Sequence, residues 1–180
     1  GTDEDGLRRK AENKPRNTKR ITSELGNVSP VIIVPGSWTE SELRFHAENI
    51  ATQMANNGGF NCNAAKVLIF HENWNQRTEF MAMLKAVLAQ LPSRPAYYPG
   101  AAERYDKFIG GHPQAIPIGE RTDDHLPWTL IPDCSSNDEN EICFSEESFC
   151  GITAQTTLSG SDAADFLQTA VTFCNERLWG

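Results

Sequence analysis

The sequence lacks the features that would place the protein in a membrane or on a nucleic acid. Its apolar runs, such as Val31 to Val34, are far too short to span a bilayer, which takes about 20 residues. The N-terminus does not have the basic-then-apolar layout of a signal peptide. Basic residues are in the minority, with 16 Lys and Arg against 24 Asp and Glu and a net charge of −8. Because an acidic chain repels a phosphate backbone, we expect no nucleic-acid partner, and we expect no membrane partner either.

Paired cysteine spacing is also missing. The chain has five cysteines, an odd number, and no two of them form a C-x-x-C pair. This usage is typical of reduced thiols in a cytoplasmic protein. Cys134, Cys143 and Cys150 lie close together in the sequence, but no His lies in that stretch, so we expect no metal site.

The apolar content that is present, 39% of 180 residues, is enough for one domain with a core. Predicted strands alternate with predicted helices along the chain. This alternation predicts an α/β fold, a three-layer sandwich in which a mostly parallel sheet lies between helices. The predicted strands are 21–25, 31–34, 64–70, 128–131 and 152–158, and the predicted helices are 39–56, 75–91, 101–109 and 161–178.

Local signals define several of these elements. Thr39 and Glu42 make a capping box, and Ser161 is the predicted cap of the last helix. The run 64–70 is nearly all apolar, which predicts burial on both faces. The predicted buried faces of the helices are Leu43, Ala47, Ile50, Ala51 and Met54; Phe80, Leu84, Val87, Leu88 and Leu91; and Leu167, Val171, Cys174 and Leu178.

Two residues suited to acyl chemistry occur in the first half of the chain. Cys62 ends the sequence N-G-G-F-N-C, between a glycine break and a predicted buried strand. Glycines let the backbone approach a ligand, and backbone N–H groups there can stabilise an oxyanion. Glu24 ends a predicted strand, where partial burial would raise the pKa of its carboxyl group and make it a usable base. Taken alone, the position of Cys62 favours a buried inert thiol, and that of Glu24 favours an exposed residue at a strand end.

A third pair of candidates lies further along the chain. Glu147 and Phe149 are separated by one residue, so on an extended backbone their side chains point the same way. Such a pair suits a ribose and a ring, although an acidic loop beside a core phenylalanine is the ordinary alternative. The histidines have no identifiable partner and are interpreted as surface or packing residues: His46, His71, His112 and His125.

In their order along the chain, these residues resemble the motifs of the aldehyde dehydrogenase superfamily. Residues 24–26, followed by Ser29-Pro30, resemble its E-L-G-G-x-S-P motif, and residues 57–62 resemble its N-x-G-Q-x-C motif. Residues 147–149 resemble E-x-F-G-P, and Gly1-Thr2 resembles the Gly-Ser that opens a helix facing the cofactor pyrophosphate.

The chain departs from these motifs in ways that indicate a divergent member. Asn27 replaces a glycine, Phe60 stands where Gln is common, and Cys150 replaces the glycine after E-x-F. The resemblance implies that residues 1–20 are the tail of a dinucleotide-binding domain with its linker, and that residues 21–180 are the catalytic domain. The chain starts without Met and stops just after a predicted helix, so we expect a segment of a longer protein whose catalytic domain is incomplete at its C-terminal end.

The resemblance also implies the chemistry. The Cys62 thiolate attacks an aldehyde, hydride leaves for the nicotinamide of NAD or NADP, and Glu24 activates the water that hydrolyses the thioester. A small aldehyde is the implied substrate, and a homo-oligomer is the implied assembly. The implied cofactor contacts are Gly1, Thr2, Leu25, Gly26, Glu147 and Phe149.

Three other interpretations remain open on the sequence alone. In the first, coenzyme A rather than water takes the acyl group, although the presence of Glu24 favours water. In the second, the protein is a catalytically silent member with a structural or regulatory role. In the third, it is an α/β domain in which the positions of Cys62 and Glu24 are a coincidence.

Overall fold

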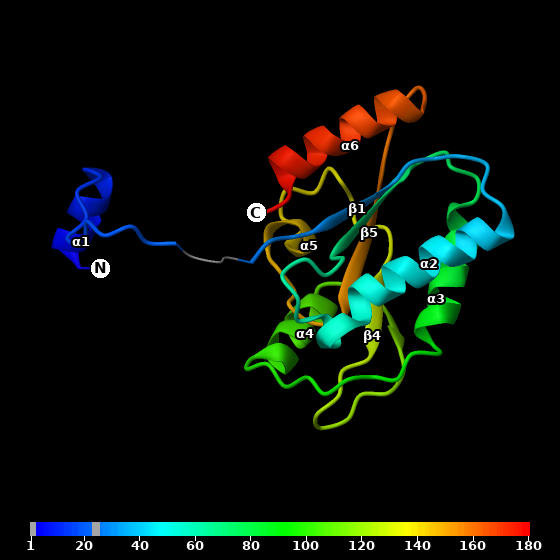
Figure 1. Ribbon diagram of the computed structural model, residues 1–180, viewed down its shortest axis with the longest axis horizontal. Coiled ribbons are helices and arrows are strands. Elements are labelled where there is room, and N and C mark those ends of the chain that lie inside the picture. Colours follow the sequence, from blue (N-terminus) through cyan, green and yellow to red (C-terminus); the bar gives the residue numbers. More distant parts are fainter. Residues whose placement is uncertain (1–2, 23–25) are drawn as a thin grey trace.

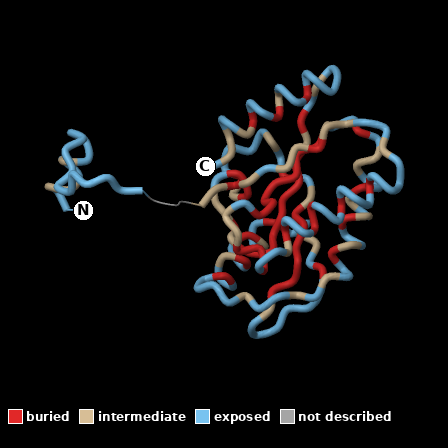
Figure 2. The backbone as a smooth tube through the Cα atoms, in the orientation of Figure 1, coloured by how far each residue is buried: buried red, intermediate tan, exposed pale blue. Residues whose placement is uncertain are grey.

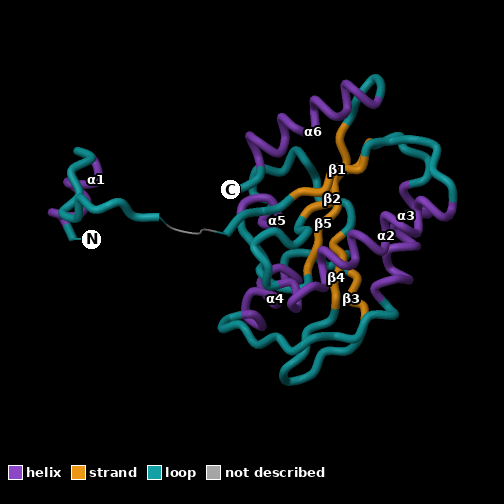
Figure 3. Tube along the Cα trace, viewed as in Figure 1, coloured by secondary structure: helices purple, strands orange, loops and turns teal. Residues whose placement is uncertain are grey.

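The computed structural model describes residues 3–22 and 26–180, and residues 26–180 form one sheet flanked by helices. The five strands lie in the order β1-β2-β5-β4-β3 (Figure 3). Neighbours among the first four are parallel, and β3 pairs antiparallel with β4. The strands are β1 (Pro30–Ile33), β2 (Val67–His71), β3 (Ile116–Ile118), β4 (Trp128–Ile131) and β5 (Ile152–Leu158). The predicted mostly parallel sheet is therefore confirmed, whereas the short strand β3 was not predicted, since a central proline weakens its strand signal.

Helices cover both faces of the sheet, as the predicted three-layer sandwich requires (Figure 1). On one face, α2 (Glu40–Ala55) and α3 (Arg77–Leu88) share a core with the sheet. On the other face, α4 (Ala101–Gly110), α5 (Ile142–Ser145) and α6 (Ala163–Arg177) share a second core. The sheet thus separates two apolar cores.

Strand β2 shows why its sequence is a continuous apolar run. Val67 and Ile69 belong to the core beneath α4, α5 and α6, whereas Leu68 and Phe70 belong to the core beneath α2 and α3. All four are 0% exposed. Figure 2 shows the buried residues concentrated in the strands at the centre of the sheet. Burial of side chains on both faces of a central parallel strand confirms the prediction for this run.

Helix α2 follows its prediction closely. The backbone N–H of Thr39 donates to Glu42 Oε2 at 2.7 Å, and Thr39 Oγ1 accepts from the backbone N–H of Glu42 at 3.3 Å. All five residues of its predicted inner face are buried. Helix α3 buries three of its five predicted residues, Phe80, Leu84 and Leu88, while Val87 and Leu91 are partly buried.

The predicted buried face of α6 is correct only in part: Cys174 and Leu178 are partly buried against the core. Its buried residues are Phe166, Ala170 and Phe173, whereas Leu167 and Val171 are 42% and 40% exposed. Both sets have helical spacing, so periodicity does not separate them. The two phenylalanines bury more apolar surface than the predicted stripe would, and this decides which face meets the sheet.

The ends of the predicted elements differ in two further respects. Helix α6 is capped by Asp162 rather than Ser161, since Asp162 Oδ1 accepts from two backbone N–H groups at 2.9 Å. Ile21 and Thr22, the described part of the predicted strand 21–25, are in no strand, and Ile21 is 67% exposed.

Helix α1 (Glu4–Ala11) has no buried residue, as expected for a solvated helix. Among the helices described, none has the length and apolar character needed to cross a membrane.

Candidate functional site

A cavity of about 460 Å³ brings together residues from three of the four sequence motifs. It is lined by Gly26, Asn57, Phe60, Cys62, Tyr97, Tyr98, Glu147 and Phe149. Four of these eight were candidate site residues from the sequence: Gly26, Cys62, Glu147 and Phe149. The other candidates, Gly1, Thr2, Glu24 and Leu25, lie outside the described residues.

The cavity lies at the amino ends of the parallel strands. Gly26 comes before β1, Cys62 before β2, and Phe149 before β5. Ligands of open α/β sheets usually bind outside the carboxyl ends of the strands. A search guided by that rule alone would therefore examine the opposite edge of this sheet, and the motifs locate the cavity better than the fold rule does.

The loop that carries Cys62 is shaped by residues with left-handed backbone angles. A 3₁₀ turn at Asn56–Gly59 follows α2, and Asn57, Gly58 and Gly59 have φ values of 53°, 68° and 82°. A Cβ atom on Gly59 would lie 2.7 Å from the carbonyl carbon of Cys150. Only glycine allows this approach, so residue 59 holds the thiol loop directly against the loop that carries Glu147 and Phe149.

Cys62 itself is partly exposed. Its carbonyl oxygen accepts a hydrogen bond from Ser29 Oγ at 3.2 Å, which ties the loop to the segment before β1. The thiol thus lies on a braced backbone beside an open cavity, where a small substrate can reach it.

Glu147 presents a free acceptor at the same cavity. Its Oε1 atom is buried and has no hydrogen-bond partner among residues 3–22 and 26–180. Burial raises the pKa of this carboxyl group, and the charge of Lys66, a hydrogen bond from the Asn27 backbone and the charge of Arg104 oppose the rise. A Cβ atom on Gly26 would lie 1.9 Å from Glu147 Oε2, so a larger residue there would displace the Glu147 carboxyl group. A buried acceptor without a donor suits a ligand hydroxyl group.

Phe149 lines the cavity, but its backbone conformation differs from the extended one that the sequence predicted. Its φ is 43°, so the backbone is not extended as expected, and such a conformation costs about 1–3 kcal/mol. Arg104 holds the strained segment, donating from Nε to Ser148 O at 3.2 Å and from Nη2 to Phe149 O at 3.4 Å. The Phe149 ring packs edge-to-face on Tyr98, with the ring centroids 4.7 Å apart.

Several residues of the site were missed from the sequence. Lys66 is 4% exposed and donates from Nζ to Gly59 O at 2.9 Å, and burial lowers its pKa. A lysine inside a predicted buried strand was a signal that it has a specific partner. Tyr97 donates from its hydroxyl group to Asn57 Oδ1 at 3.0 Å. Arg104 gave no signal, because its partners are backbone carbonyls, and two of the three lie more than 40 positions away.

Two histidines have carboxylate partners that the sequence analysis did not identify. His125 Nδ1 lies 2.7 Å from Asp124 Oδ1. His112 is 6% exposed, and its Nε2 lies 3.0 Å from Glu141 Oε1. The interpretation of this residue as lacking a partner was therefore wrong. The partner follows it by 29 positions and reaches it only through the fold.

Comparison by sequence finds no relative, since no protein-family model and no curated protein matches the chain. Comparison of structures does. The fold matches salicylaldehyde dehydrogenase from Pseudomonas putida G7, solved with salicylaldehyde, with a TM-score of 0.71 and 18% identity over 94% of this chain and 35% of that chain. It matches gamma-glutamyl-gamma-aminobutyraldehyde dehydrogenase from Burkholderia cenocepacia J2315 with a TM-score of 0.67 and 20% identity over 87% and 34% of the two chains.

A third similar structure is the NADP-dependent glyceraldehyde-3-phosphate dehydrogenase from Bacillus halodurans C-125, solved with NADP. Its TM-score is 0.66, with 18% identity over 86% of this chain and 32% of that chain. The chain therefore has the fold of one segment of the aldehyde dehydrogenases and spans about a third of their length. The resemblance and the fold class expected from the motifs are confirmed at the level of the fold.

Proposed function

We propose that the chain is the thiol-bearing part of an NAD(P)-dependent aldehyde dehydrogenase that oxidises a small aldehyde to a carboxylic acid. The observation that carries the proposal is the cavity in which Gly26, Cys62, Glu147 and Phe149 meet. These residues come from three separate motifs, and a coincidental resemblance gives no reason for them to share one site. The structural likeness to aldehyde dehydrogenases supports the same conclusion independently.

In the proposed reaction, Cys62 is the nucleophile. Its thiolate adds to the aldehyde carbon, a C–S bond forms, and the carbonyl oxygen takes the negative charge. The Cys62 backbone N–H is one candidate donor for that oxygen. NAD(P)⁺, when bound, supplies the acceptor for the hydride that leaves the adduct, and a thioester on Cys62 remains.

Glu24 is the proposed base for the second half of the reaction, and its assignment rests on its motif. Its carboxylate takes a proton from water, and the water oxygen attacks the thioester carbon. The C–S bond then breaks, the carboxylic acid leaves, and the Cys62 thiolate is restored. Glu24 then releases its proton to solvent, so each turnover converts one aldehyde and one water to one acid, with one hydride transferred and one proton released.

Glu147 and Phe149 fit the nicotinamide half of the cofactor. The unpartnered Oε1 of Glu147 is a ready acceptor for a ribose hydroxyl group, and the Phe149 ring offers an apolar surface beside it. On the same resemblance we propose that residues 21–180 belong to the catalytic domain and that residues 1–20 lead out of a dinucleotide-binding domain, with contacts from Gly1, Thr2 and Leu25.

The test is the oxidation of a panel of aldehydes by the full-length protein with NAD and with NADP. Cys62→Ala should abolish the activity. Cys174→Ala is the matched control, because Cys174 is a partly exposed thiol on α6, outside the cavity, and this variant should keep normal turnover. Normal turnover by Cys62→Ala would disprove the proposal. Inactivity of the wild-type protein with every aldehyde would instead favour the catalytically silent alternative.

A second variant separates water from coenzyme A as the acyl acceptor. Glu24→Gln should give one burst of NADH followed by slow turnover, because loss of a general base costs about 10²–10⁴-fold in rate. A steady-state rate that is unchanged by Glu24→Gln and depends on added coenzyme A would refute hydrolysis and identify an acyl-transferring enzyme.

A further inference from the structure

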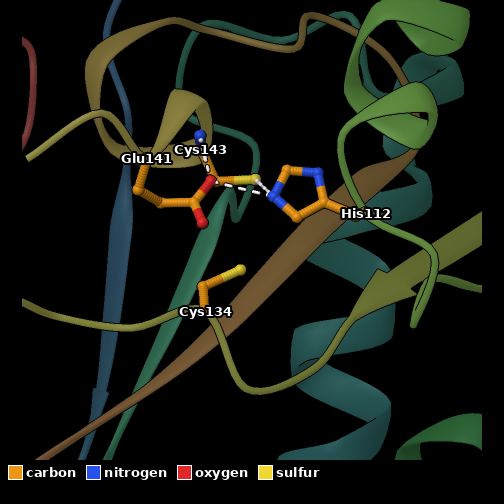
Figure 4. Close-up of side chains that lie close together, drawn as sticks. All are labelled: His112, Cys134, Glu141 and Cys143. Carbon is orange, nitrogen blue, oxygen red and sulfur yellow. Dashed lines mark hydrogen bonds and ion pairs between the residues drawn. The ribbon is translucent and has the colours of Figure 1, made fainter. Parts of the chain in front are cut away.

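A second group of reactive side chains lies away from the Cys62 cavity. His112, Cys134, Glu141 and Cys143 point toward one another, and their ligand atoms all lie within 4.8 Å of one another (Figure 4). They come from three segments of the chain: the residues just after α4, the loop after β4, and the start of α5. Their exposed fractions are 6%, 4%, 8% and 4%. We call this group the His112 cluster.

The side chains of the His112 cluster are those that bind zinc. Two thiols, one imidazole and one carboxylate make four protein ligands, which is the number found in structural zinc sites. Bonds of about 2.0–2.3 Å in a tetrahedral site place the ligand atoms about 3.3–3.8 Å apart. The contact between Cys143 Sγ and His112 Nε2 is 3.9 Å, and the largest separation is within 4.8 Å, so modest side-chain rotation closes the set around one ion.

The hydrogen bonds of His112 give an independent indication of a cation. Its Nδ1 lies 2.6 Å from Phe108 O, and a carbonyl oxygen can only accept, so Nδ1 carries the proton of the neutral ring. The lone pair of Nε2 then faces Glu141 Oε1 at 3.0 Å, although that oxygen is itself an acceptor and already receives the backbone N–H of Cys143 at 2.9 Å. Two acceptors this close require a positive species between them, which is a proton or a metal ion.

The same hydrogen bond prepares His112 to be a ligand. Histidines that bind metals usually donate their other ring N–H to a carbonyl or carboxylate, which fixes the ring and the tautomer. Phe108 O has this role here. Cys134 is likewise fixed by its backbone, since its N–H donates to Gln155 O at 2.9 Å and its carbonyl accepts from Thr156 Oγ1 at 2.7 Å.

The His112 cluster is also accessible from the surface. A cavity of about 350 Å³ is lined by His112, Cys134 and Glu141 together with Asp133 and Asp138. The two additional carboxylates favour a cation at its mouth. The side chains are therefore buried enough to form a closed site and still have a path by which an ion can enter.

We propose that His112, Cys134, Glu141 and Cys143 bind one Zn²⁺ ion in a closed structural site. Binding forms four metal–ligand bonds and releases to water the two thiol protons and any proton shared by His112 and Glu141, with no change of oxidation state. Thiolate and imidazole ligands favour zinc over magnesium or calcium, which prefer oxygen ligands. The sequence argument against a metal site considered only histidines near the cysteines, and His112 reaches them from the end of α4.

The ion would stabilise the fold by linking three segments of the chain. It would join the end of α4, the loop after β4 and the start of α5. Helix α5 ends at Ser145, directly before the segment that carries Glu147 and Phe149. A zinc ion at the His112 cluster would therefore hold one wall of the Cys62 cavity in place from outside the cavity.

The test is the zinc content of the purified protein, measured by mass spectrometry after dialysis. We expect about one zinc more per chain in the wild-type protein than in the double variant Cys134→Ser and Cys143→Ser. Cys174→Ser, a change outside the His112 cluster, is the matched control and should keep the full zinc content. Glu141→Gln retains most of the shape of the side chain and should bind zinc more weakly, which distinguishes loss of a ligand from loss of the fold.

Two further measurements keep the proposal testable if a variant does not fold. Zinc in excess should raise the melting temperature of chelator-treated wild-type protein by roughly 5 °C or more. Cobalt in place of zinc should give the intense near-ultraviolet absorption of thiolate-to-cobalt charge transfer. Wild-type protein without bound zinc and with a melting temperature that zinc does not change would overturn the proposal. A disulfide between Cys134 and Cys143 in the purified protein would overturn it as well.

Discussion

The Cys62 cavity and the His112 cluster both contain thiols, but the thiol is accessible in the cavity and buried in the cluster. Cys62 is partly exposed, stands on a glycine-rich loop and faces a cavity of about 460 Å³. Cys134 and Cys143 are each 4% exposed and are surrounded by an imidazole and a carboxylate. An accessible thiol beside open space can attack a substrate, whereas a buried thiol among other ligands can only bind an ion or remain inert.

Three cysteines outside the Cys62 cavity have raised pKa values. A hydrogen bond with Cys134, followed by burial, raises the pKa of the Cys143 thiol. Burial raises the pKa of Cys150 to about 11 and also raises the pKa of Cys174. The comparison teaches that the environment, rather than the residue type, decides which cysteine is a nucleophile.

The largest expected effect comes from adding a side-chain atom at the point where the two loops of the Cys62 cavity touch. Gly59→Ala places a methyl group 2.7 Å from the Cys150 backbone at a φ of 82°. Left-handed strain of about 1–2 kcal/mol and overpacking of about 1–3 kcal/mol together predict a loss of about 2–5 kcal/mol in the free energy of unfolding. Denaturant unfolding monitored by circular dichroism measures this loss.

The chain offers a matched control for the strain alone. Gly119 also has a positive φ, 97°, but a Cβ atom there would meet nothing within 4 Å. Gly119→Ala should therefore cost only the backbone term, about 1–2 kcal/mol. If the two variants lose equal stability, the close approach at Gly59 does not brace the cavity.

The next effect is the contrast in thiol reactivity between the two regions. Brief treatment of the folded protein with iodoacetamide at neutral pH should label Cys62 first, and Cys134, Cys143 and Cys150 last. A thiol with a pKa of about 11, as for Cys150, is ionised to only about one part in 10⁴ at pH 7. Mass-spectrometric mapping gives the order, and we expect at least about a hundredfold difference in rate.

Chelation adds a second arm to the labelling experiment. If zinc protects the His112 cluster, a chelator should speed the labelling of Cys134 and Cys143 and leave the rate at Cys62 unchanged. Equal labelling of all five cysteines in a sample whose circular dichroism is that of a folded protein would contradict the contrast between the two regions.

The smallest effect concerns the charge at the Cys62 cavity. Unfolded Glu147 loses its proton near pH 4.5, whereas burial raises its pKa in the folded state. Between pH 4.5 and the raised pKa, the folded state binds more protons than the unfolded state. The free energy of unfolding therefore falls as the pH rises through this range and recovers as the pH is lowered. Glu147→Gln should remove this fall, which is under about 1 kcal/mol because much of the side chain is solvated.

Lys66 provides the counter-test for Glu147. Its positive charge lowers the pKa of Glu147, so Lys66→Met should raise that pKa further and extend the fall in stability to higher pH. Carboxyl NMR titration of Glu147 measures the pKa directly. An unchanged titration in Lys66→Met would show that the two charges do not interact across the cavity.

The sequence was sufficient where one local signal decided the structure. The capping box at Thr39 and the stripe that follows it define α2, and the strand predicted at 152–158 is found with the same bounds as β5. It was insufficient for α6, where Phe166 and Leu167 begin two stripes of equal periodicity, and only packing on the sheet selects the first.

The candidate site divides in the same way. Motif order identified Cys62, Glu147 and Phe149, and the structure places them around one cavity. Lys66 and Arg104 were missed because they bind backbone carbonyls, and a carbonyl has no residue identity that a sequence could reveal.

By itself, then, the sequence determined most of the helices and strands and the order of the motifs, because helix and strand periodicity and capping are properties of neighbouring residues. Only the tertiary structure decided that Gly59 touches Cys150 and that His112 meets Glu141. Such contacts join residues far apart in the chain, and they depend on strand register and on which helix face is buried. The packing of the whole core determines the register and the buried face, so no local segment of the sequence is enough to predict them.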